Sequence, residues 1–256
     1  MKIASIASKV LGALVLTGCA GLSGAPAPLI APDTVTVAEP AAGGPARDAL
    51  LCDRRVDDFA STAAGELPAG WEAWDAGDLE EARRDRAFIV VREGAEPLLR
   101  VQPASRELTL GRGVPAWDFR AYPVLEWRWR LPHPVAEAGD RPLARVGAVW
   151  LTGLPFVVRR IEYTWSAHRP LAAQESSRFG QDRALVVASN ESSAGEWHTV
   201  RVDVRRHYAA LFSSDDPKPP AGIAISAPES RRGGQAAVDY RDFRLCRYAA
   251  QGAEAP

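Results

Sequence analysis

Short apolar runs that are interrupted at every second position by polar residues recur through most of this chain. The clearest is Val124–Leu131, in which tryptophans and leucines alternate with Glu126, Arg128 and Arg130. Side chains of a β-strand point alternately to opposite faces, so this run predicts a strand with one apolar and one charged face. Because most apolar runs of the chain are of this kind, we predict an all-β protein.

Ten segments have a strand pattern, and Gly and Pro separate them. They are Phe88–Val91, Leu98–Val101, Glu107–Leu110, Val124–Leu131, Leu143–Leu151, Phe156–Trp165, Arg183–Ser189, Trp197–Val204, Gly222–Ser226 and Ala236–Cys246. Two further segments, Asp78–Arg86 and Arg205–Phe212, are predicted to be short helices. Many strands with little helix indicate a single antiparallel β-sandwich.

The first 19 residues have the pattern of a bacterial export signal. Lys2 and Lys9 give a positive charge to the segment before the apolar run Val10–Leu16. This run is too short to cross a bilayer as a helix. The run ends in Leu-Thr-Gly-Cys, which resembles the lipobox of bacterial lipoproteins, where the Cys is lipid-modified and becomes the new N-terminus. We therefore expect residues 1–18 to be a signal peptide and Cys19 to carry a lipid anchor. An ordinary secretory signal with a chance Cys is the alternative.

The residue after the cysteine bears on the destination of such a lipoprotein. It is Ala20 rather than Asp, which in lipoproteins of Gram-negative bacteria implies passage to the outer membrane. We expect the protein in the bacterial cell envelope, anchored by two or more acyl chains and facing the periplasm.

A tether is predicted between the anchor and the domain, over residues 19–51. More than half of residues 20–50 are Ala, Gly or Pro and none is aromatic, so this segment cannot bury enough apolar area to offset its ordering entropy. A flexible chain of this length spans roughly 30 Å. All eight tryptophans follow residue 70, which places the β-sandwich domain at residues 52–248 and leaves 249–256 as a disordered tail.

Charge and motifs exclude several classes of ligand. The chain has 31 Lys and Arg residues against 32 Asp and Glu residues, whereas nucleic-acid-binding proteins usually carry a basic excess. It has no P-loop and no Gly-x-Gly-x-x-Gly or Gly-x-Ser-x-Gly motif. His198 and His207 have no further ligand at metal-binding spacing. We expect no nucleic acid, no nucleotide, no cofactor and no metal.

Cys52 and Cys246 lie at the two ends of the predicted domain. They are the two cysteines that remain when Cys19 carries the lipid, and an even number of cysteines in an exported protein suggests a disulfide. The first and last strands of many β-sandwiches are neighbours, which would bring the two sulfurs together. Two buried free thiols are the alternative.

Several motifs resemble a bacterial family, the domain of unknown function 3047. They are Leu67–Trp71, Leu125–Leu131, Arg145–Val149, Tyr163–Trp165, Arg183–Val187, Gly195–Trp197, Val202–Tyr208, Pro219–Ile225 and Tyr240–Leu245. The resemblance implies a secreted or periplasmic jelly-roll sandwich, similar to galactose-binding and carbohydrate-binding modules. It supplies no activity.

Glu126, Arg128 and Arg130 are the first candidate ligand-binding residues. If the neighbouring tryptophans face the core, these side chains line the opposite surface of the sheet, where guanidinium groups could bind carboxylates or phosphates bidentately. The alternative is a ladder of charges between strands that binds no ligand.

Tyr163, Trp165 and His168 are a second candidate set, because an aromatic pair with polar groups is usual in glycan sites. The alternative is an aromatic pair in the core with an exposed loop histidine. Arg145 and Arg183, which begin two of the quoted motifs, complete the candidate ligand-binding residues. No catalytic residue is assigned.

Three functions remain open. The first is a lipid-anchored, non-catalytic β-sandwich that binds an envelope glycan or an envelope protein. The second is an enzyme of the polysaccharide lyase or glycoside hydrolase type, using Tyr163, His168 and nearby Arg or Glu. It needs two carboxylates at a defined separation, or a base beside a charge neutraliser, and the sequence sets no such distance. The third is a structural component of envelope assembly.

Overall fold

A computed structural model describes nine ranges of the chain. They are residues 35–38, 50–73, 76–135, 141–152, 157–176, 181–189, 194–214, 218–230 and 236–249. The predicted signal peptide, Cys19, most of the tether and all but the first residue of the tail lie outside them. No helix in these ranges is long and apolar enough to cross a membrane.

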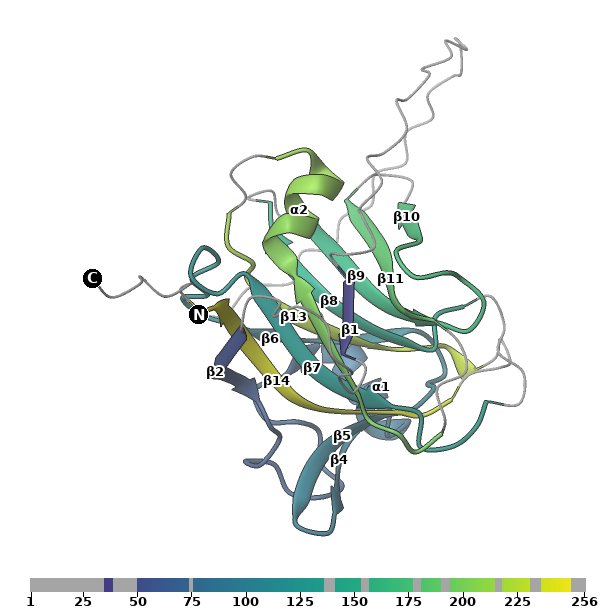
Figure 1. Cartoon of the computed structure of the whole chain (residues 1–256). Coiled ribbons are helices and arrows are strands. Elements are labelled where there is room, and N and C mark those ends of the chain that lie inside the picture. The colour runs from purple at the N-terminus through teal and green to yellow at the C-terminus, as the bar shows by residue number, and fades with distance from the viewer. Residues whose placement is uncertain are drawn as a thin grey trace, which may run out of the picture.

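Two sheets of seven strands each pack face to face in the described ranges (Figure 1). The first has the order β1 (Val35–Ala38), β12 (His198–Asp203), β7 (Val124–Arg130), β14 (Val238–Tyr248), β5 (Glu96–Val101) and β4 (Phe88–Glu93), with β2 (Leu50–Asp57) also paired to β14. The second has the order β10 (Gln174–Ser176), β11 (Asp182–Ser189), β9 (Val158–Ser166), β8 (Ala144–Leu151), β13 (Gly222–Ala227), β6 (Leu108–Gly113) and β3 (Glu72–Ala73).

The predicted fold class is confirmed. The chain passes repeatedly from one sheet to the other, as in a jelly roll: β12 and β14 belong to the first sheet, and β13 between them belongs to the second. The two helices are α1 (Ala76–Arg84) and α2 (Val204–Phe212), close to the predicted bounds. Helix α2 begins where β12 ends, because the Asp203 carboxylate accepts the backbone N–H of Arg206 at 2.8 Å.

Two features differ from the prediction. Strands β9 and β11 pair in parallel, so the second sheet is mixed. Between β9 and β11 in the sequence, the chain forms β10, which pairs antiparallel with β11. Because the chain reverses there, β9 and β11 run in the same direction. In addition, Val35–Ala38, inside the predicted tether, pairs as β1 with β12, which would otherwise be the edge strand of the first sheet. The backbone of an edge strand offers hydrogen bonds to any extended segment that reaches it.

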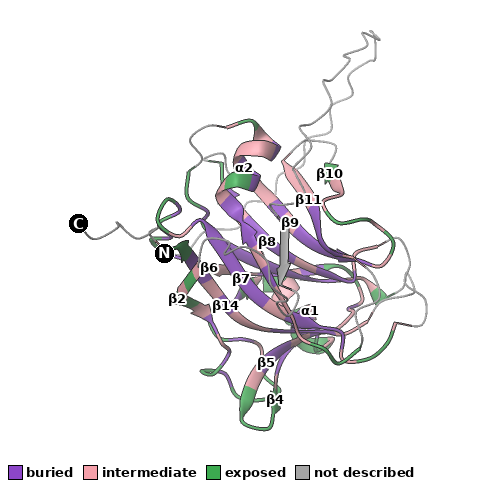
Figure 2. Cartoon of the chain, in the orientation of Figure 1, coloured by how far each residue is buried: buried purple, intermediate pink, exposed green. Residues whose placement is uncertain are grey.

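Aromatic side chains fill the space between the sheets. Trp127 and Trp129 of β7 are fully buried. The ring centroid of Trp127 lies 5.9 Å from that of Tyr163 of β9, and the ring centroid of Trp129 lies 5.5 Å from that of Trp165 of the same strand. Figure 2 shows β7, β8 and β9 mostly buried, whereas the hairpin that joins β4 and β5 is exposed at its tip. The alternation in Val124–Leu131 therefore has the predicted direction, with its tryptophans in the core.

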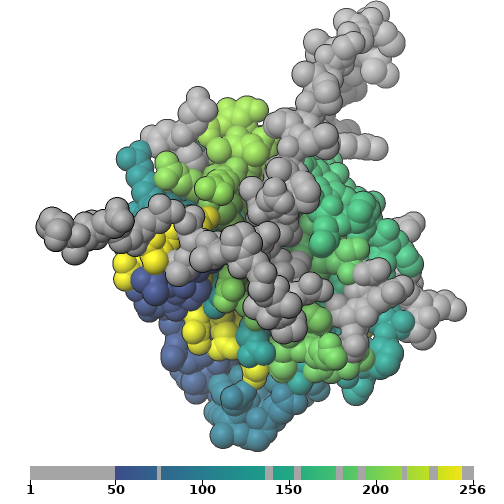
Figure 3. Space-filling view, viewed as in Figure 1, coloured from purple at the N-terminus to yellow at the C-terminus, as the bar shows by residue number. Residues whose placement is uncertain are grey.

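A disulfide joins Cys52 to Cys246, as predicted, with an S–S distance of 2.05 Å. Strand β2 pairs antiparallel with β14, and this pairing places the two cysteines side by side. The space-filling view shows β2 (dark blue) against β14 (yellow) on the near face (Figure 3). The first strand of the predicted domain is thus fastened to its last.

Removal of this disulfide is expected to destabilise the domain strongly. It closes a loop with a sequence separation of 194 residues, for which the chain-entropy model gives a loss of up to about 5 kcal/mol in the free energy of unfolding. The measurement is urea unfolding of the oxidised protein against the Cys52→Ala/Cys246→Ala double variant. Equal unfolding midpoints would contradict the expectation.

Candidate functional site

The outer face of β7 carries the first set of predicted residues. Glu126, Arg128 and Arg130 alternate with the core residues of this strand, so they point away from the second sheet. Arg128 lies opposite Arg241 of β14, and Arg130 lies opposite Asp239. The structure therefore brings these three residues together with charged residues of β14.

Asp239 is the buried centre of an ion-pair network. Its carboxylate accepts two hydrogen bonds from Arg100, at 2.7 and 3.0 Å, and one from Arg130 Nε at 3.0 Å. Arg130 also donates to Glu93 at 2.9 Å, which lowers the pKa of that carboxyl group. Burial opposes the charged form of Arg130, but the bonds to Glu93 and Asp239 outweigh it and raise the pKa. Arg130 is therefore committed to holding β7, β14 and β4 together.

Glu126 has a similar structural partner. It is buried, and its Oε2 accepts a hydrogen bond from Arg201 Nε of β12 at 2.6 Å. Arg201 lies directly opposite Glu126 in the sheet. Glu126 and Arg130 therefore form ion pairs with neighbouring strands on the outer face, as in the alternative that binds no ligand.

Arg128 lies in a different environment, which we call the arginine–tryptophan cluster and define as Arg128, Arg130, Arg241 and Trp197. The three guanidinium carbons lie 5.6, 4.5 and 4.2 Å, respectively, from the centroid of the Trp197 ring. Trp197, which immediately precedes β12, is half-buried. Cation–π contact uses the flat face of a guanidinium group and leaves its in-plane N–H donors available to a ligand.

A β-bulge in β14 places a carboxylate beside this cluster. The register of β14 against β7 shifts between Arg241 and Arg244, and Asp242 within the bulge has a φ of 58°. Such a backbone conformation is uncommon for a residue other than Gly. The bulge brings the Asp242 carboxylate within 3.6 Å of Arg241 and Arg244 and within 3.8 Å of Arg128.

Arg128 remains incompletely neutralised. Within the described ranges, the side chain of Arg128 has no hydrogen bond, and its closest carboxylate oxygen is the one 3.8 Å away on Asp242. Burial and the neighbouring positive charge of Arg241 lower the pKa of the Arg128 guanidinium. Its side chain is still 32% exposed, so an anion from solution can reach it.

Tyr163 and Trp165, from the second predicted set, require a correction. They are 0% and 1% exposed, and both face the tryptophans of β7. We therefore withdraw them as ligand-binding residues and assign them to the core. Burial raises the pKa of the Tyr163 phenol well above its usual value, so this group stays protonated and is unsuited to act as a base.

The other predicted residues are dispersed. His168 is exposed in the loop after β9. Arg145, on the outer face of the second sheet, forms an ion pair of 2.8 Å with Glu107. Arg183 donates to the carbonyl of Leu211 at 3.2 Å and lies over the Phe212 ring, so it holds the end of α2.

Of the carboxylates that an enzyme could use, Glu162 and Asp182 pair with the same arginine, at 3.3 and 3.5 Å, whereas Glu162 and Glu126 lie far apart. Glu162 alternates with the core residues Ile161 and Tyr163 of β9, so it lies on the outer face of the second sheet. Glu126 lies on the outer face of the first. The two are therefore separated by the whole thickness of the sandwich, and together they cannot serve one glycosidic bond.

Potential metal ligands come together at one place in the described ranges. Cys52, Cys246 and Glu126 have ligand atoms within 4.8 Å of one another. The two sulfurs are bonded to each other, so they are not thiolates and this group is not a metal site.

Sequence reasoning missed three members of the site, namely Trp197, Arg241 and Asp242. All three lie within the quoted motifs Gly195–Trp197 and Tyr240–Leu245, which was the signal that could have drawn attention to them. Their approach to Arg128 depends on strand order and on the bulge, neither of which is visible in a single sequence.

The predicted family resemblance is confirmed in the C-terminal half. The model of the family described as "Protein of unknown function (DUF3047)" matches residues 140–244. A search of curated proteins finds no match.

Among solved structures, a family 11 carbohydrate-binding module of a cellulosomal cellulase of Clostridium thermocellum is similar, with 9% identity over 75% of this chain and 92% of that chain and a TM-score of 0.40. An endoglucanase of Rhodothermus marinus has 11% identity over 78% of this chain and 100% of that chain, with a TM-score of 0.39. The xylan-binding domain of a Paenibacillus barcinonensis protein has 12% identity over 73% and 92% of the two chains, with a TM-score of 0.30. The fold class of this protein rests on its own strand pairing.

Replacement of Asp239 by Asn is expected to lower the free energy of unfolding by about 3 kcal/mol, because two arginines would lose a buried counter-charge. The matched control is Asp53→Asn. Asp53 pairs with Arg247 at 2.9 Å, but both side chains are nearly half exposed, so a clearly smaller change in the free energy of unfolding is expected. Chemical unfolding of both variants provides the comparison, and equal effects would show that Asp239 is not the centre of the network.

Proposed function

We propose that this protein is a lipid-anchored envelope protein whose first sheet binds an acidic glycan through the arginine–tryptophan cluster. Arg128 carries the proposal: it is an accessible guanidinium group with no hydrogen bond in the described part of the chain, beside a second arginine. A carboxylate that binds there would supply the bidentate partner that Asp242 does not supply at 3.8 Å.

The surroundings of Arg128 favour an acidic ligand over a neutral one. Arg130 and Arg241 share the Trp197 ring with Arg128, so three positive charges gather at one point of the sheet. Asp239, Glu93 and Glu96 neutralise Arg130 and Arg241. Arg128 has no carboxylate oxygen nearer than 3.8 Å in the described ranges, so the carboxylate of a uronic acid would give it a direct partner.

An extended sugar chain fits the position of the cluster. The cluster lies on the outer face of a sheet, where a polymer can pass without entering a closed cavity. The resemblance to the family named above implies a sandwich similar to carbohydrate-binding modules. An envelope protein with an acidic surface is the other partner that this face could bind, and the glycan experiment distinguishes the two.

The anchor is proposed from the N-terminal sequence. Lys2, Lys9, the apolar run and Leu-Thr-Gly-Cys19 have the order of a lipoprotein signal. Ala20 supports placement in the outer membrane, with the domain facing the periplasm. A domain held near the envelope by lipid would meet envelope polysaccharides at high effective concentration.

Binding to polygalacturonate, compared with the same polymer after methyl esterification, tests the proposed ligand class. The wild-type protein should bind the acid form and lose binding to the ester, because esterification removes the charge without changing the sugar backbone. Arg128→Ala should weaken binding to the acid form about ten-fold or more, since a charge-assisted pair contributes about 1.5–3 kcal/mol. Isothermal titration calorimetry measures both affinities.

The control variant for this experiment is Arg92→Ala, which removes an exposed arginine near the tip of the β4–β5 hairpin. Its affinity should equal that of the wild type. Equal binding of the acid and the ester, or unchanged binding by Arg128→Ala, would refute the proposed site. A lack of binding to both polymers and to alginate would reject the glycan and favour an envelope protein as partner.

The anchor is tested by labelling cells with an alkyne analogue of palmitate. Wild-type protein should incorporate the label and sediment with membranes, whereas Cys19→Ala should do neither, because the thiol that receives the lipid is gone. Cys52 and Cys246 serve as internal controls, since neither is available for acylation once they are bonded. Equal label in Cys19→Ala would contradict the anchor.

A further inference from the structure

Two arginines of the second sheet lie on its inner face, at the end of the sandwich where α2 sits. Arg159 of β9 comes two residues before Ile161, and Arg183 of β11 comes two residues before Leu185. Ile161 and Leu185 are fully buried core residues. Because every second residue of a strand faces the same way, both arginines share the core-facing side of the sheet. Figure 1 shows α2 at this end, next to β9.

Both arginines contact the second half of α2. Arg159 donates a hydrogen bond of 2.6 Å to the hydroxyl of Tyr208, and Arg183 donates one of 3.2 Å to the carbonyl of Leu211. Their guanidinium carbons lie 4.6 and 5.4 Å, respectively, from the centroid of the Phe212 ring. We call Arg159, Arg183, Tyr208 and Phe212 the arginine–phenylalanine cluster. One aromatic ring thus holds two positive charges.

The arginines of this cluster have no carboxylate partner. Within the described ranges neither forms an ion pair, and the two acceptors that they reach, a hydroxyl and a carbonyl, are uncharged. Asp182 precedes Arg183 in the sequence, but it pairs with Arg160 at 3.5 Å on the other face of the sheet. The negative end of the α2 dipole attracts Arg183, although it supplies only part of a charge. The two positive charges are therefore incompletely neutralised.

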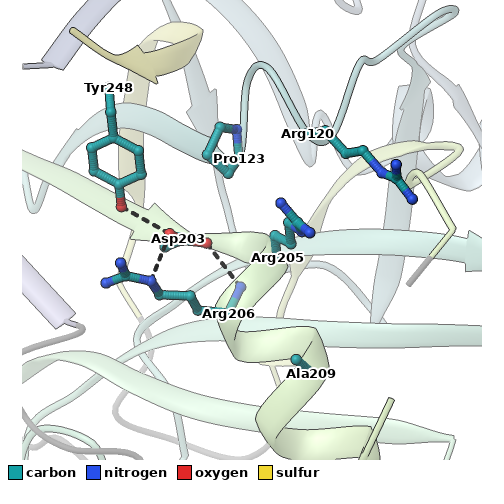
Figure 4. Close-up of a pocket in the computed structure, with 7 residues that line it drawn as sticks. All are labelled: Arg120, Pro123, Asp203, Arg205, Arg206, Ala209 and Tyr248. Atoms are coloured by element: carbon teal, nitrogen blue, oxygen red, sulfur yellow. Dashed lines mark hydrogen bonds and ion pairs between the residues drawn. The ribbon is translucent and has the colours of Figure 1, made fainter. Parts of the chain in front are cut away.

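The other end of α2 has the opposite arrangement (Figure 4). There the Asp203 carboxylate accepts the backbone N–H of Arg206 at 2.8 Å, and it also lies 3.4 Å from Nε of the same arginine. Asp203 is one of the residues that line a pocket of about 370 Å³ at this point. Arg206 is thus paired within the protein, whereas Arg159 and Arg183 have no such carboxylate in the described part of the chain.

An incompletely paired arginine on the inner side of a sheet lowers the stability of the protein. Nε of Arg159 is buried and, among the described residues, has no hydrogen-bond partner, and such a donor carries a desolvation penalty. Contact with the Phe212 ring offsets part of that penalty. Arg159, Arg183 and Phe212 are nevertheless all partly exposed. An anion from solution can therefore reach the cluster and supply the missing acceptors.

We infer that the arginine–phenylalanine cluster binds a phosphate monoester, held between Arg159 and Arg183 beside the Phe212 ring. Arg183 lies directly opposite Ile161 in the parallel pairing of β11 with β9. Arg159 and Arg183 are therefore diagonal neighbours, roughly 7–8 Å apart along the sheet. This inference does not rest on the proposed glycan site.

The chemistry of the two guanidinium groups favours a phosphate monoester over other anions. Each planar fork binds two oxygens at once. A carboxylate has only two oxygens, which one fork already uses, whereas a phosphate monoester has three terminal oxygens to share between two forks. It also carries about −1.5 to −2 charges at neutral pH, close to the charge of the two arginines. The partly exposed Phe212 ring offers an apolar contact to the esterified group.

Calorimetric titration of the full-length protein in detergent, at constant ionic strength, tests the inference. The parent protein carries Arg128→Ala, which removes the accessible guanidinium group of the proposed glycan site. The probes are inorganic phosphate and glycerol 3-phosphate, with glycerol and acetate as the neutral and singly charged controls. Both phosphates should bind and should raise the thermal unfolding midpoint, because a ligand stabilises the state that binds it. The two controls should do neither.

Variants of the parent locate the binding. Arg159→Gln and Arg183→Gln each remove one charge but keep an N–H donor for the acceptor on α2. Each should weaken glycerol 3-phosphate binding about ten-fold or more, the loss expected for one charge-assisted pair. Arg159→Lys keeps the charge without the planar fork and should give a smaller loss. The matched control Arg83→Ala, which removes an exposed arginine from α1, should leave the affinity unchanged. A cooperative thermal transition establishes that each variant is folded.

Short-chain lipids distinguish the source of the phosphate. Dihexanoyl phosphatidic acid presents a phosphate monoester, and dihexanoyl phosphatidylglycerol presents a diester. Tighter binding of the phosphatidic acid than of glycerol 3-phosphate identifies a lipid headgroup, and equal or weaker binding identifies a small phosphorylated molecule, both in agreement with the inference. Parent affinity in both Gln variants, equal affinity for acetate, or equal affinity for the two lipids would overturn it.

The two aspartates that follow α2 in the sequence, Asp215 and Asp216, provide a further control. If these carboxylates neutralised the arginines, phosphate would bind to the Asp215→Asn/Asp216→Asn double variant and not to the parent. That result would also reject the inference. Binding of phosphate by the parent and by the double variant alike agrees with it.

Discussion

The contact between the aromatic side chains of β7 and β9 is the interaction on which the rest of this structure depends. Trp127 and Trp129 meet Tyr163 and Trp165 across the sandwich, and all four are buried. Large aromatic rings bury more apolar area than any other side chains and also pack edge to face. Because alternate residues of a strand face opposite ways, the tryptophans that enter the core also direct Glu126, Arg128 and Arg130 outward. The core and the candidate site are thus two faces of one strand.

Strand β14 converts this arrangement into a site. It pairs with β7 on one side and with β5 and β2 on the other, so three neighbouring strands depend on it. Asp239 of this strand forms ion pairs with two arginines, Arg100 and Arg130. The bulge places Asp242 beside the cluster. Cys246 joins the strand to β2 through the disulfide. Among the three arginines of the cluster, Arg128 has the most distant carboxylate oxygen, at 3.8 Å, and the most exposed side chain. Stability and the proposed ligand binding therefore involve the same set of charges.

Much of the fold was open to prediction because it is encoded locally. The period-two pattern predicted ten strands close to β4–β9 and β11–β14, and two short helices close to α1 and α2. The disulfide followed from cysteine number and position. Short strands such as β3 and β10 escaped prediction, because two or three residues do not establish a period. The parallel pairing of β9 with β11 escaped because strand direction depends on the path of the chain, which residue patterns do not record.

The candidate site divides in the same way. The sequence by itself determined that Arg128 and Arg130 face away from the tryptophans, since alternation along a strand is a local property. Only the tertiary structure decided that Arg130 is occupied by Asp239 and Glu93 while Arg128 is not, and that Tyr163 and Trp165 lie in the core. It also decided that Trp197, Arg241 and Asp242 join Arg128, although they lie more than 60 residues away in the chain. The reason is physical: which charges neutralise one another depends on distances between strands, and strand order sets those distances.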